Sequence, residues 1–448
     1  MPSPPSPLLV PSWLTRPRDK LGQFLKYVWK VYGLPHELNL VKDERRRPTI
    51  STGRVVKGLL FTALFRLRSL NALEGELGRT PFQRLLGGRV TPGRKAFSAD
   101  TVARVLDGLD HVGLRKILNH VLGKAERNKV FREGSYAARR AVTLDGWEPF
   151  CSYKRHCEHC LVRRVRQGET VVPQYYHCFV VALLLGPEID VVLDLEPLRT
   201  ADLRRAEGER TDCHDGESTA ALRLIDRLHE VYGRFIDLFV LDALYPTGPV
   251  LTRLTAYGYG AVITVKKQTD EPLKEALALI AGQSPCRVWE DPDKSEHLEA
   301  WDVDDLETLD TFSGKVRVVR VEVRSTRTDE KRTWCAAVIG DRTRTLSVQA
   351  VHKLHRSRWH IENTGFNQWA QHWHLDHVFR HSPGAVVAVM LLWCLAFNLM
   401  QLFVYKRLRK PRVPRDPCKT LLALVAEMFA DLARLHQPVP WELLFDTS

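Results

Sequence analysis

Three acidic residues occupy positions where a folded core would place apolar side chains. Asp145 ends the apolar run AVTL, Asp242 ends the run LFVL, and Glu362 lies within RSRWHIENTGFNQWAQHW, residues 356–373. Carboxylates that lie together repel one another unless a cation neutralises them, and Mg²⁺ is a hard cation that binds carboxylate oxygens. If the three acids converge, the sequence predicts a metal site suited to phosphodiester chemistry, in which two metal ions assist an in-line displacement.

Each acid also has an ordinary structural explanation. Asp-Gly after a strand, as at Asp145, is a common turn, and an acid at a strand end such as Asp242 often caps a helix. Glu362 stands four residues after Arg358, the spacing of a helical ion pair. Only the ordered combination of the three acids favours a site.

The segment around Glu362 has the spacing of a single helical stripe. Residues 355, 358, 362, 366 and 369 are separated by 3, 4, 4 and 3 positions, so a regular helix would align His355, Arg358, Glu362, Phe366 and Trp369. Arg358 is suited to a bidentate phosphate contact. Trp369 suits either stacking on an unpaired base or packing in a core, and packing is the more common use of a helical aromatic residue.

The elements that must position these acids form a mixed α/β pattern. β-Branched and apolar runs predict strands at 140–147, 175–185, 189–198, 235–245 and 260–267, with a helix at 217–233 that ends at Gly233. The order of these elements indicates a layered domain with a mixed sheet. Reactive groups gather at strand ends in such sheets, where Asp145 and Asp242 are expected.

The regions before and after this pattern differ from it. Residues 99–118 have helical spacing, with Ser98 as a candidate cap, and residues 315–327 and 332–340 predict an inserted antiparallel β unit. The predicted organisation is a basic, partly disordered segment at 1–50, a helical domain at 51–138, a first part of the layered domain at 139–267, a β-rich insertion at 268–345, a Glu-bearing helical part at 346–382 and a helical C-terminal region at 383–448.

Composition favours an intracellular protein with a polyanionic partner. The 448 residues carry a net charge of +13, from 66 Lys and Arg against 53 Asp and Glu. Such a balance favours nucleic acid, although an ordinary soluble basic protein has the same property. Nine cysteines and a first segment without a continuous apolar core predict a reducing, cytoplasmic setting.

One apolar segment admits a membrane interpretation. Residues 385–405 are apolar apart from Asn398 and Gln401, and a basic run follows them. The uninterrupted apolar part, residues 385–397, has the length of a buried core helix, with Ser382 and Pro383 as its expected start. We predict a core helix and no membrane partner, with a membrane-associated protein as the less favoured alternative.

The order and spacing of these features resemble those of the DDE transposases of bacterial insertion sequences. Around its Glu, the resembling group has Tyr, then Arg three residues later, Glu four further on and Lys seven beyond. This chain matches at Arg358 and Glu362, and at the neighbouring Trp359, Ile361, Asn363, Gly365, Phe366 and Asn367. HWHLDHVFRH at 372–381 is similar to that group's continuation, and the helical N-terminal region with LDG and KRHCEHCL extends the similarity over most of the chain.

This resemblance implies that the helical domain at 51–138 binds DNA, and that residues 139–267 and 346–382 form an RNase H-like catalytic domain interrupted by the β insertion at 268–345. It implies that Asp145, Asp242 and Glu362 hold two Mg²⁺ ions, for which Mn²⁺ can substitute, in DNA cleavage at element ends and strand transfer into target DNA. A homodimer on DNA and a cytoplasmic, nucleoid-associated location follow by the same analogy. The chain departs from the group at two positions, with His355 in place of Tyr and Trp369 in place of Lys. The alternative is therefore a noncatalytic or domesticated DNA-binding derivative.

A second metal site and a basic loop follow Asp145. Cys157 and Cys160 form a CxxC pair, and His177 or Cys178 with one of Cys151, His156 or His159 would complete a tetrahedral zinc site. The expectation of zinc rests on one CxxC pair without a second matching pair. The same segment carries Lys154, Arg155 and Arg163, which either track DNA phosphates or form a solvated loop. The other candidate DNA-binding residues are His355, Arg358 and Trp369.

Overall fold

The computed structural model describes residues 19–132, 136, 138–186, 189–265, 271–307, 312–408 and 417–441. The chain divides into a helical unit, residues 1–128 and 368–448, and a sheet unit, residues 129–367. The predicted disorder of the first ten residues lies outside the described residues. The predicted domain boundaries stay predictions.

The sheet unit contains the strands expected from the sequence and, in addition, strands at 151–152, 161–167, 287–291 and 296–306 that were not predicted. They are β1 (Ala141–Trp147), β2 (Cys151–Ser152), β3 (Leu161–Gln167), β4 (Thr170–Tyr176), β5 (Phe179–Leu185), β6 (Val191–Pro197), β7 (Leu238–Leu241), β8 (Gly260–Thr264), β9 (Arg287–Asp291), β10 (Glu296–Leu306), β11 (Val316–Ser325) and β12 (Lys331–Ile339). The run at 175–185 is divided between the end of β4 and all of β5, and the run at 235–245 forms only the short β7.

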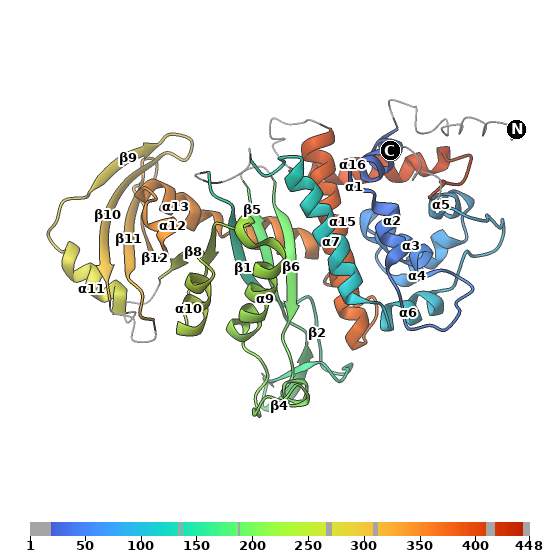
Figure 1. The fold of residues 1–448 in the computed structure, drawn as a ribbon, viewed down its shortest axis with the longest axis horizontal. Coiled ribbons are helices and arrows are strands. Elements are labelled where there is room, and N and C mark those ends of the chain that lie inside the picture. Colours follow the sequence, from blue (N-terminus) through green and yellow to red (C-terminus); the bar gives the residue numbers. More distant parts are fainter. Residues whose placement is uncertain are drawn as a thin grey trace, which may run out of the picture. The chain divides into compact units, whose positions relative to one another are not determined.

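Within the described part of the chain, nine strands form one mixed sheet in the order β6-β5-β1-β7-β8-β12-β11-β10-β9 (Figure 1). β1, β5 and β6 pair as an antiparallel meander, and β7 and β8 then add parallel to β1. Every residue of β5, β7 and β8 is buried, which explains why these strands are apolar without alternation. The predicted mixed α/β, RNase H-like class is confirmed.

The predicted insertion is antiparallel, and it extends the main sheet. β12 pairs antiparallel with β8, from Ile339 against Ala261 to Ala336 against Thr264. β11, β10 and β9 follow outward by antiparallel pairing. β2, β4 and β3 form a separate three-stranded sheet, called here the small sheet.

Helices of the sheet unit connect and cover these strands. They are α8 (Ala201–Ala206), α9 (Glu217–Tyr232), α10 (Gly248–Ala256), α11 (Glu271–Ile280), α12 (Asp341–Arg344) and α13 (Val348–Ser357), with short turns η2 (Gly233–Phe235) and η3 (Ile361–Phe366). The predicted helix at 217–233 is confirmed as α9, and Gly233 ends it with a φ of 44°. α9 lies against β5 and β6 (Figure 1).

The helical unit contains α1 (Lys20–Tyr32), α2 (Leu34–Leu40), α3 (Thr52–Leu64), α4 (Leu70–Leu77), α5 (Thr80–Leu86), α6 (Ala99–Asp107), α7 (His111–Arg127), α15 (Pro383–Leu402), η4 (Phe403–Arg407), α16 (Pro417–Asp431) and η5 (Leu432–Arg434). α14 (Asn367–Trp373) begins at the boundary residue. The Ser98 cap of α6 is confirmed, because its hydroxyl accepts from the Thr101 N–H at 3.2 Å.

The apolar segment forms α15, which packs against α3, α6 and α7. By length and composition, the helical segment Pro383–Arg407 could cross a membrane, with a mean hydropathy of 2.2 over its most apolar stretch. However, 89% of that stretch is buried inside the protein. A single such helix is also what the core of a soluble protein contains. The expected core helix, with Ser382 as N-cap and Pro383 in its first turn, agrees with this packing.

Candidate active site

The pairing of β1 with β7 places two of the predicted acids side by side. The strands are parallel, and Leu144 of β1 pairs with Leu241 of β7 as the last pair of this ladder. Asp145 directly follows Leu144, and Asp242 directly follows Leu241, so both acids lie at the same edge of the sheet. The Asp145 and Asp242 side chains are each 17% exposed, so the edge presents two partly buried carboxylates.

Glu362 reaches the same edge from a π-helical turn. The chain leaves α13 at Ser357 and forms η3, Ile361–Phe366, where the hydrogen-bond spacing is wider than in an α-helix. Phe366 of η3 stacks on Trp147 at the end of β1, with ring centroids 5.7 Å apart and planes at 14°. This aromatic contact anchors the turn that carries Glu362 to the strand that carries Asp145.

A single guanidinium group contacts all three predicted acids. Arg358 Nη1 lies 3.4 Å from Asp145 Oδ2 and 3.2 Å from Glu362 Oε1, and Nη2 lies 3.8 Å from Asp242 Oδ1. The Arg358 side chain is only 3% exposed. Residues separated by more than two hundred positions in the sequence therefore converge on one buried cation.

The environment of Asp145 opposes its ionisation. Burial is the largest cause and raises the pKa of Asp145 from 3.8 to about 6, and the negative charges of Glu362 and Glu217 act in the same direction. The Arg358 charge and the Gly146 N–H, which donates to Asp145 Oδ1 at 2.9 Å, lower this pKa. A carboxylate in such a setting gains from a nearby cation.

A fourth acid, Glu217, lies beside this group and was not anticipated from the sequence. Glu217 is the first residue of α9, and its Oε2 accepts a hydrogen bond from the Tyr245 hydroxyl at 3.1 Å. A Cβ atom added at Gly146 would lie 2.4 Å from Glu217 Oε1. The absence of a side chain at Gly146 thus permits the close approach. An acid in the first turn of a helix is so common that no local pattern distinguishes this one.

The structure corrects the predicted role of His355. His355 is 4% exposed, and its Nε2 lies 2.9 Å from Thr264 Oγ1 of β8. Its ring also packs edge-on against Trp334 of β12 at 5.6 Å. His355 therefore holds α13 on the sheet, and its burial leaves no surface for DNA.

Trp369, for which base stacking and core packing were both weighed and packing was favoured, lies in a core. It is 1% exposed and packs edge-to-face on Phe397 within the helical unit, with centroids 5.9 Å apart. A side chain buried to this extent is unsuited to stacking on a base, so the core alternative holds. The single stripe expected from regular helical spacing fails because the π-helical turn changes the phase between Arg358 and Trp369.

The segment predicted as a basic loop after Asp145 forms strands β2 and β3 of the small sheet and the connection between them. Lys154 and Arg155 are exposed between β2 and β3, as are Arg164 and Arg166 on β3. Arg163 is engaged within the protein, because it forms two hydrogen bonds with Glu148 at 2.6 and 2.7 Å and lies 4.5 Å above the Tyr176 ring. Arg163 is therefore less available for a phosphate than its neighbours.

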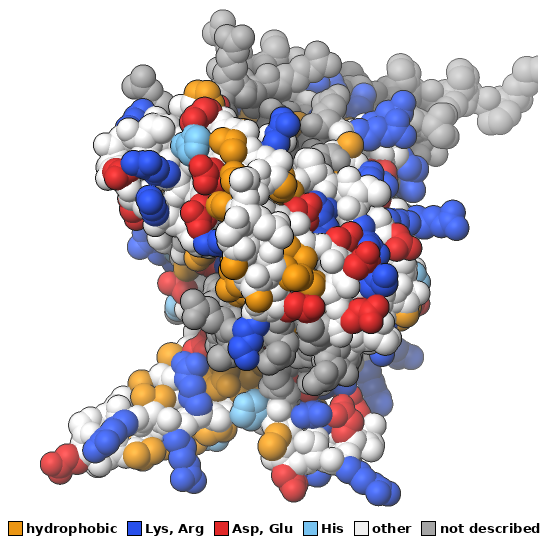
Figure 2. All heavy atoms as spheres, turned by 90° about the vertical axis from the view of Figure 1, so that its left-hand side faces the viewer, with side chains coloured by type: hydrophobic (Ala, Val, Ile, Leu, Met, Phe, Trp, Pro, Cys, Tyr) orange, Lys and Arg blue, Asp and Glu red, His pale blue; other side chains and the backbone are white. Residues whose placement is uncertain are grey.

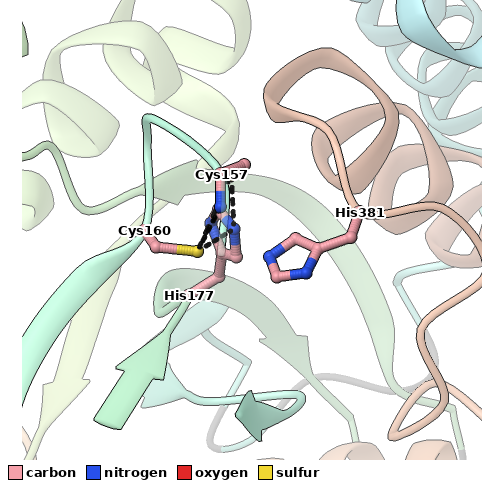
Figure 3. A group of neighbouring side chains, drawn as sticks. All are labelled: Cys157, Cys160, His177 and His381. Carbon is pink, nitrogen blue, oxygen red and sulfur yellow. Dashed lines mark hydrogen bonds between the residues drawn. The ribbon is translucent and has the colours of Figure 1, made fainter. Parts of the chain in front are cut away.

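Two cysteines and one histidine form a second candidate metal group. Cys157 Sγ and Cys160 Sγ are 3.7 Å apart, and each lies 3.4 Å from His177 Nε2 (Figure 3). Cys178 is not among the potential ligands found in the described residues. Burial raises the pKa of the Cys178 thiol, and the negative charges of Glu217, Glu148 and Asp145 raise it further. Of the two alternatives, His177 therefore lies with the two cysteines and Cys178 does not.

Charge on the surface does not by itself mark a DNA-binding face. Figure 2 shows Lys and Arg side chains interspersed with Asp and Glu over the face that it presents. A polyanion bound there would meet both signs of charge. The net charge of +13 therefore supports association with DNA in general, without identifying the surface.

Comparison with known families agrees with this geometry. Residues 206–399 match the family model described as the transposase DDE domain, a segment that includes Asp242 and Glu362. No curated protein was found to match the chain. DDE transposases act on DNA and generally use divalent metal ions. Together with the mixed sheet, the match identifies residues 206–399 of the chain as a transposase DDE domain.

Proposed function

We propose that this chain is an enzyme that cleaves DNA at the ends of a mobile element and transfers the cut strands into target DNA. In this proposal Asp145, Asp242 and Glu362 hold the catalytic metal ions. The observation that carries the proposal is the contact of Arg358 with all three carboxylates. Three acids that meet one buried cation are close enough to serve a common site.

The donor set fits Mg²⁺. Asp145 within β1, Asp242 directly after β7 and Glu362 offer only carboxylate oxygens, the hard ligands that Mg²⁺ and Mn²⁺ prefer. One guanidinium supplies a single positive charge to three carboxylates, so further cations are electrostatically favoured. Two bound ions would supply activation of the attacking oxygen and stabilisation of the leaving oxygen in an in-line displacement.

The protein contributes position and charge around these ions. The register of β1 and β7 and the stacking of Phe366 on Trp147 fix the relative positions of the three acids. Arg358 is suited to exchange its carboxylate partners for a DNA phosphate, which a guanidinium binds with two parallel hydrogen bonds. The exposed Lys154, Arg155, Arg164 and Arg166 extend the basic character near the end of β1.

We infer that the active form is a homodimer that pairs two element ends in the cytoplasm, associated with the nucleoid while bound to DNA. Neutralisation of phosphates by Lys and Arg makes such binding steeply salt-dependent. The alternative, a DNA-binding derivative without catalysis, is suggested by the departures at His355 and Trp369. Both side chains are buried, so neither position presents a group to DNA in this chain.

The deciding experiment compares cleavage with binding. Purified protein is incubated with Mg²⁺ or Mn²⁺ and duplexes carrying the inverted repeats that flank its coding region. We expect nicking and strand joining, and we expect Glu362→Gln to reduce the rate by at least about 100-fold, the order of loss when one charged group leaves a preorganised site. Binding to the same duplex, measured by gel shift, should persist.

Glu290→Gln is the matched control. Glu290 belongs to the same unit, and its side chain is 59% exposed on β9. It should cleave like the unmodified protein. Tight binding of the repeats by the unmodified protein with no cleavage in either metal would favour the noncatalytic alternative. Equal cleavage by the Glu362→Gln variant would reject the assignment of the site.

A further inference from the structure

The small sheet has too little apolar core to explain its own stability. Of the seven residues of β3 only Leu161 is buried, and of the seven residues of β4 only Gln174 is buried. β2 has two residues, neither of them buried. Small sheets that lack a hydrophobic face are marginal in water and require another source of stability.

A group of metal-ligand side chains lies at the base of this sheet. Cys157 and Cys160 belong to the connection between β2 and β3, and His177 follows the last residue of β4. All three ligand residues belong to the sheet unit. Cys160 is 6% exposed and His177 is 7% exposed, so solvent has little access to the group.

The separations of the ligand atoms match those around a tetrahedral zinc ion. With Zn–S near 2.3 Å and Zn–N near 2.05 Å, tetrahedral angles separate two sulfurs by about 3.8 Å and a sulfur from a nitrogen by about 3.6 Å. The observed separations are 3.7 Å for the two sulfurs and 3.4 Å for each sulfur and His177 Nε2. Figure 3 shows the two cysteines and His177 facing one another.

The backbone around the cysteines supports the same arrangement. The Cys157 N–H donates to Cys160 Sγ at 3.3 Å, and the Cys160 N–H donates to the Cys157 carbonyl at 3.1 Å. The resulting tight turn brings both sulfurs to one side. Backbone donors to sulfur are the type of outer interaction that orients metal ligands.

We propose that Cys157, Cys160 and His177 bind one Zn²⁺ ion, which joins the two ends of the small sheet and fixes its basic strand β3. Thiolate and imidazole ligands select zinc, whereas the carboxylates of Asp145, Asp242 and Glu362 select Mg²⁺, so the two sites do not compete for one ion. Three protein ligands leave a fourth position for water or another donor. His381, also labelled in Figure 3, belongs to the helical unit, and no ligand role is assigned to it.

The ion would hold the small sheet in place relative to the catalytic strands. β1 ends four residues before β2 begins at Cys151, and β5 begins two residues after His177. A zinc ion bound here therefore ties together the connections that leave β1 and enter β5. Arg164 and Arg166 are exposed on β3 and would be presented to DNA in a fixed orientation. Only this DNA-binding role rests on the proposed function.

Zinc content of the purified full chain is the first test. We expect about one zinc per chain by elemental analysis, and its loss in Cys157→Ser, Cys160→Ser and His177→Gln. The matched control is Cys213→Ser, because Cys213 is an exposed cysteine of the same unit and should not affect zinc. Substitution with Co²⁺ should give the charge-transfer absorption of thiolate ligation. Absence of zinc in the unmodified chain, or full zinc retention in Cys157→Ser/Cys160→Ser, would overturn the proposal.

Hydrogen exchange tests the structural role without depending on the fate of a variant. Removal of zinc from the unmodified chain by a chelator should accelerate exchange at 151–177, while β7 and β8 remain protected, and added Zn²⁺ should restore the protection. Unchanged exchange after complete zinc removal would reject the proposal that zinc stabilises the small sheet. The same measurements on Glu362→Gln separate the two proposals, because that variant should lose cleavage and keep its zinc.

Discussion

The burial of Asp145 predicts that an inactivating substitution stabilises the protein. The pKa of Asp145 is raised from 3.8 to about 6, chiefly by burial. Since one pKa unit corresponds to about 1.4 kcal/mol, ionised Asp145 at pH 7 reduces the stability of the metal-free protein by roughly 3 kcal/mol relative to its protonated form. Asn has nearly the same shape as protonated Asp and has no charge. Asp145→Asn should therefore stabilise the metal-free sheet unit by up to about 3 kcal/mol at pH 7.

The sign of this effect fixes the pH window. Between pH 3.8 and about 6 the folded protein binds more protons at Asp145 than the unfolded chain, so its stability falls as the pH rises through this range. Above about pH 6 the effect is complete. The advantage of Asp145→Asn should be about 0.5 kcal/mol at pH 4, about 1.6 kcal/mol at pH 5 and about 3 kcal/mol at pH 7.

Native-state hydrogen exchange of the amides of β1 and β5 in EDTA measures this local free energy. Asp293→Asn is the control, since Asp293 is an exposed residue of the same unit. Mg²⁺ should stabilise the unmodified protein and should stabilise Asp145→Asn much less. If Asp145→Asn were less stable than the unmodified protein at pH 7, or if the difference did not grow between pH 5 and pH 7, the reasoning from burial would be refuted.

Three further predictions concern the same site. Gly146→Ala places a Cβ atom 2.4 Å from Glu217 Oε1, so we expect a loss of about 1–3 kcal/mol, typical of overpacking, in thermal unfolding, together with reduced cleavage. Phe366→Leu removes the stacking on Trp147 and should cost about 0.5–1.5 kcal/mol, with a larger fall in kcat than in DNA affinity because Glu362 loses its anchor. Arg358→Ala should be less stable than the unmodified protein in EDTA and should gain more stability from Mg²⁺, as measured by thermal unfolding with and without the ion.

Much of the catalytic sheet could be predicted because its strands carry their own signals. The apolar runs that precede Asp145 and Asp242 are short, buried and closed by an acid, and the structure places them as β1 and β7. Parallel pairing then makes the two acids neighbours, which strand ends in an α/β sheet favour in general. The helix α9 and the cap at Ser98 were likewise evident from local patterns.

The errors arose where tertiary packing decides the outcome. Regular helical spacing placed His355 and Trp369 on the stripe of Glu362, but the π-helical turn η3 breaks that spacing, and both side chains are buried. Glu217 was missed because nothing local distinguishes it from any acid at a helix start. The choice between His177 and Cys178 depends on which side of the chain each residue faces, and in the structure His177 Nε2 lies 3.4 Å from both cysteine sulfurs.

Arg358 explains how three carboxylates remain together without a metal ion. Its guanidinium is 3% exposed and contacts Asp145, Asp242 and Glu362. In Arg358→Ala these acids lose their shared cation, and removal of one partner from a buried ion pair costs about 3–5 kcal/mol. The same change removes the competitor for the carboxylates, so Mg²⁺ should bind more tightly and recover part of that loss.

The variant Arg358→Lys separates charge from geometry. Lysine keeps the positive charge, but a compact ammonium group lacks the planar fork that reaches several carboxylates at once. Its stability in EDTA and its gain from Mg²⁺ should both lie between those of Arg358→Ala and the unmodified protein. If Mg²⁺ stabilised all three proteins equally, Arg358 would not compete with the metal for the three carboxylates. The acids would then be ion-pair partners of Arg358 that stabilise the fold, and not metal ligands.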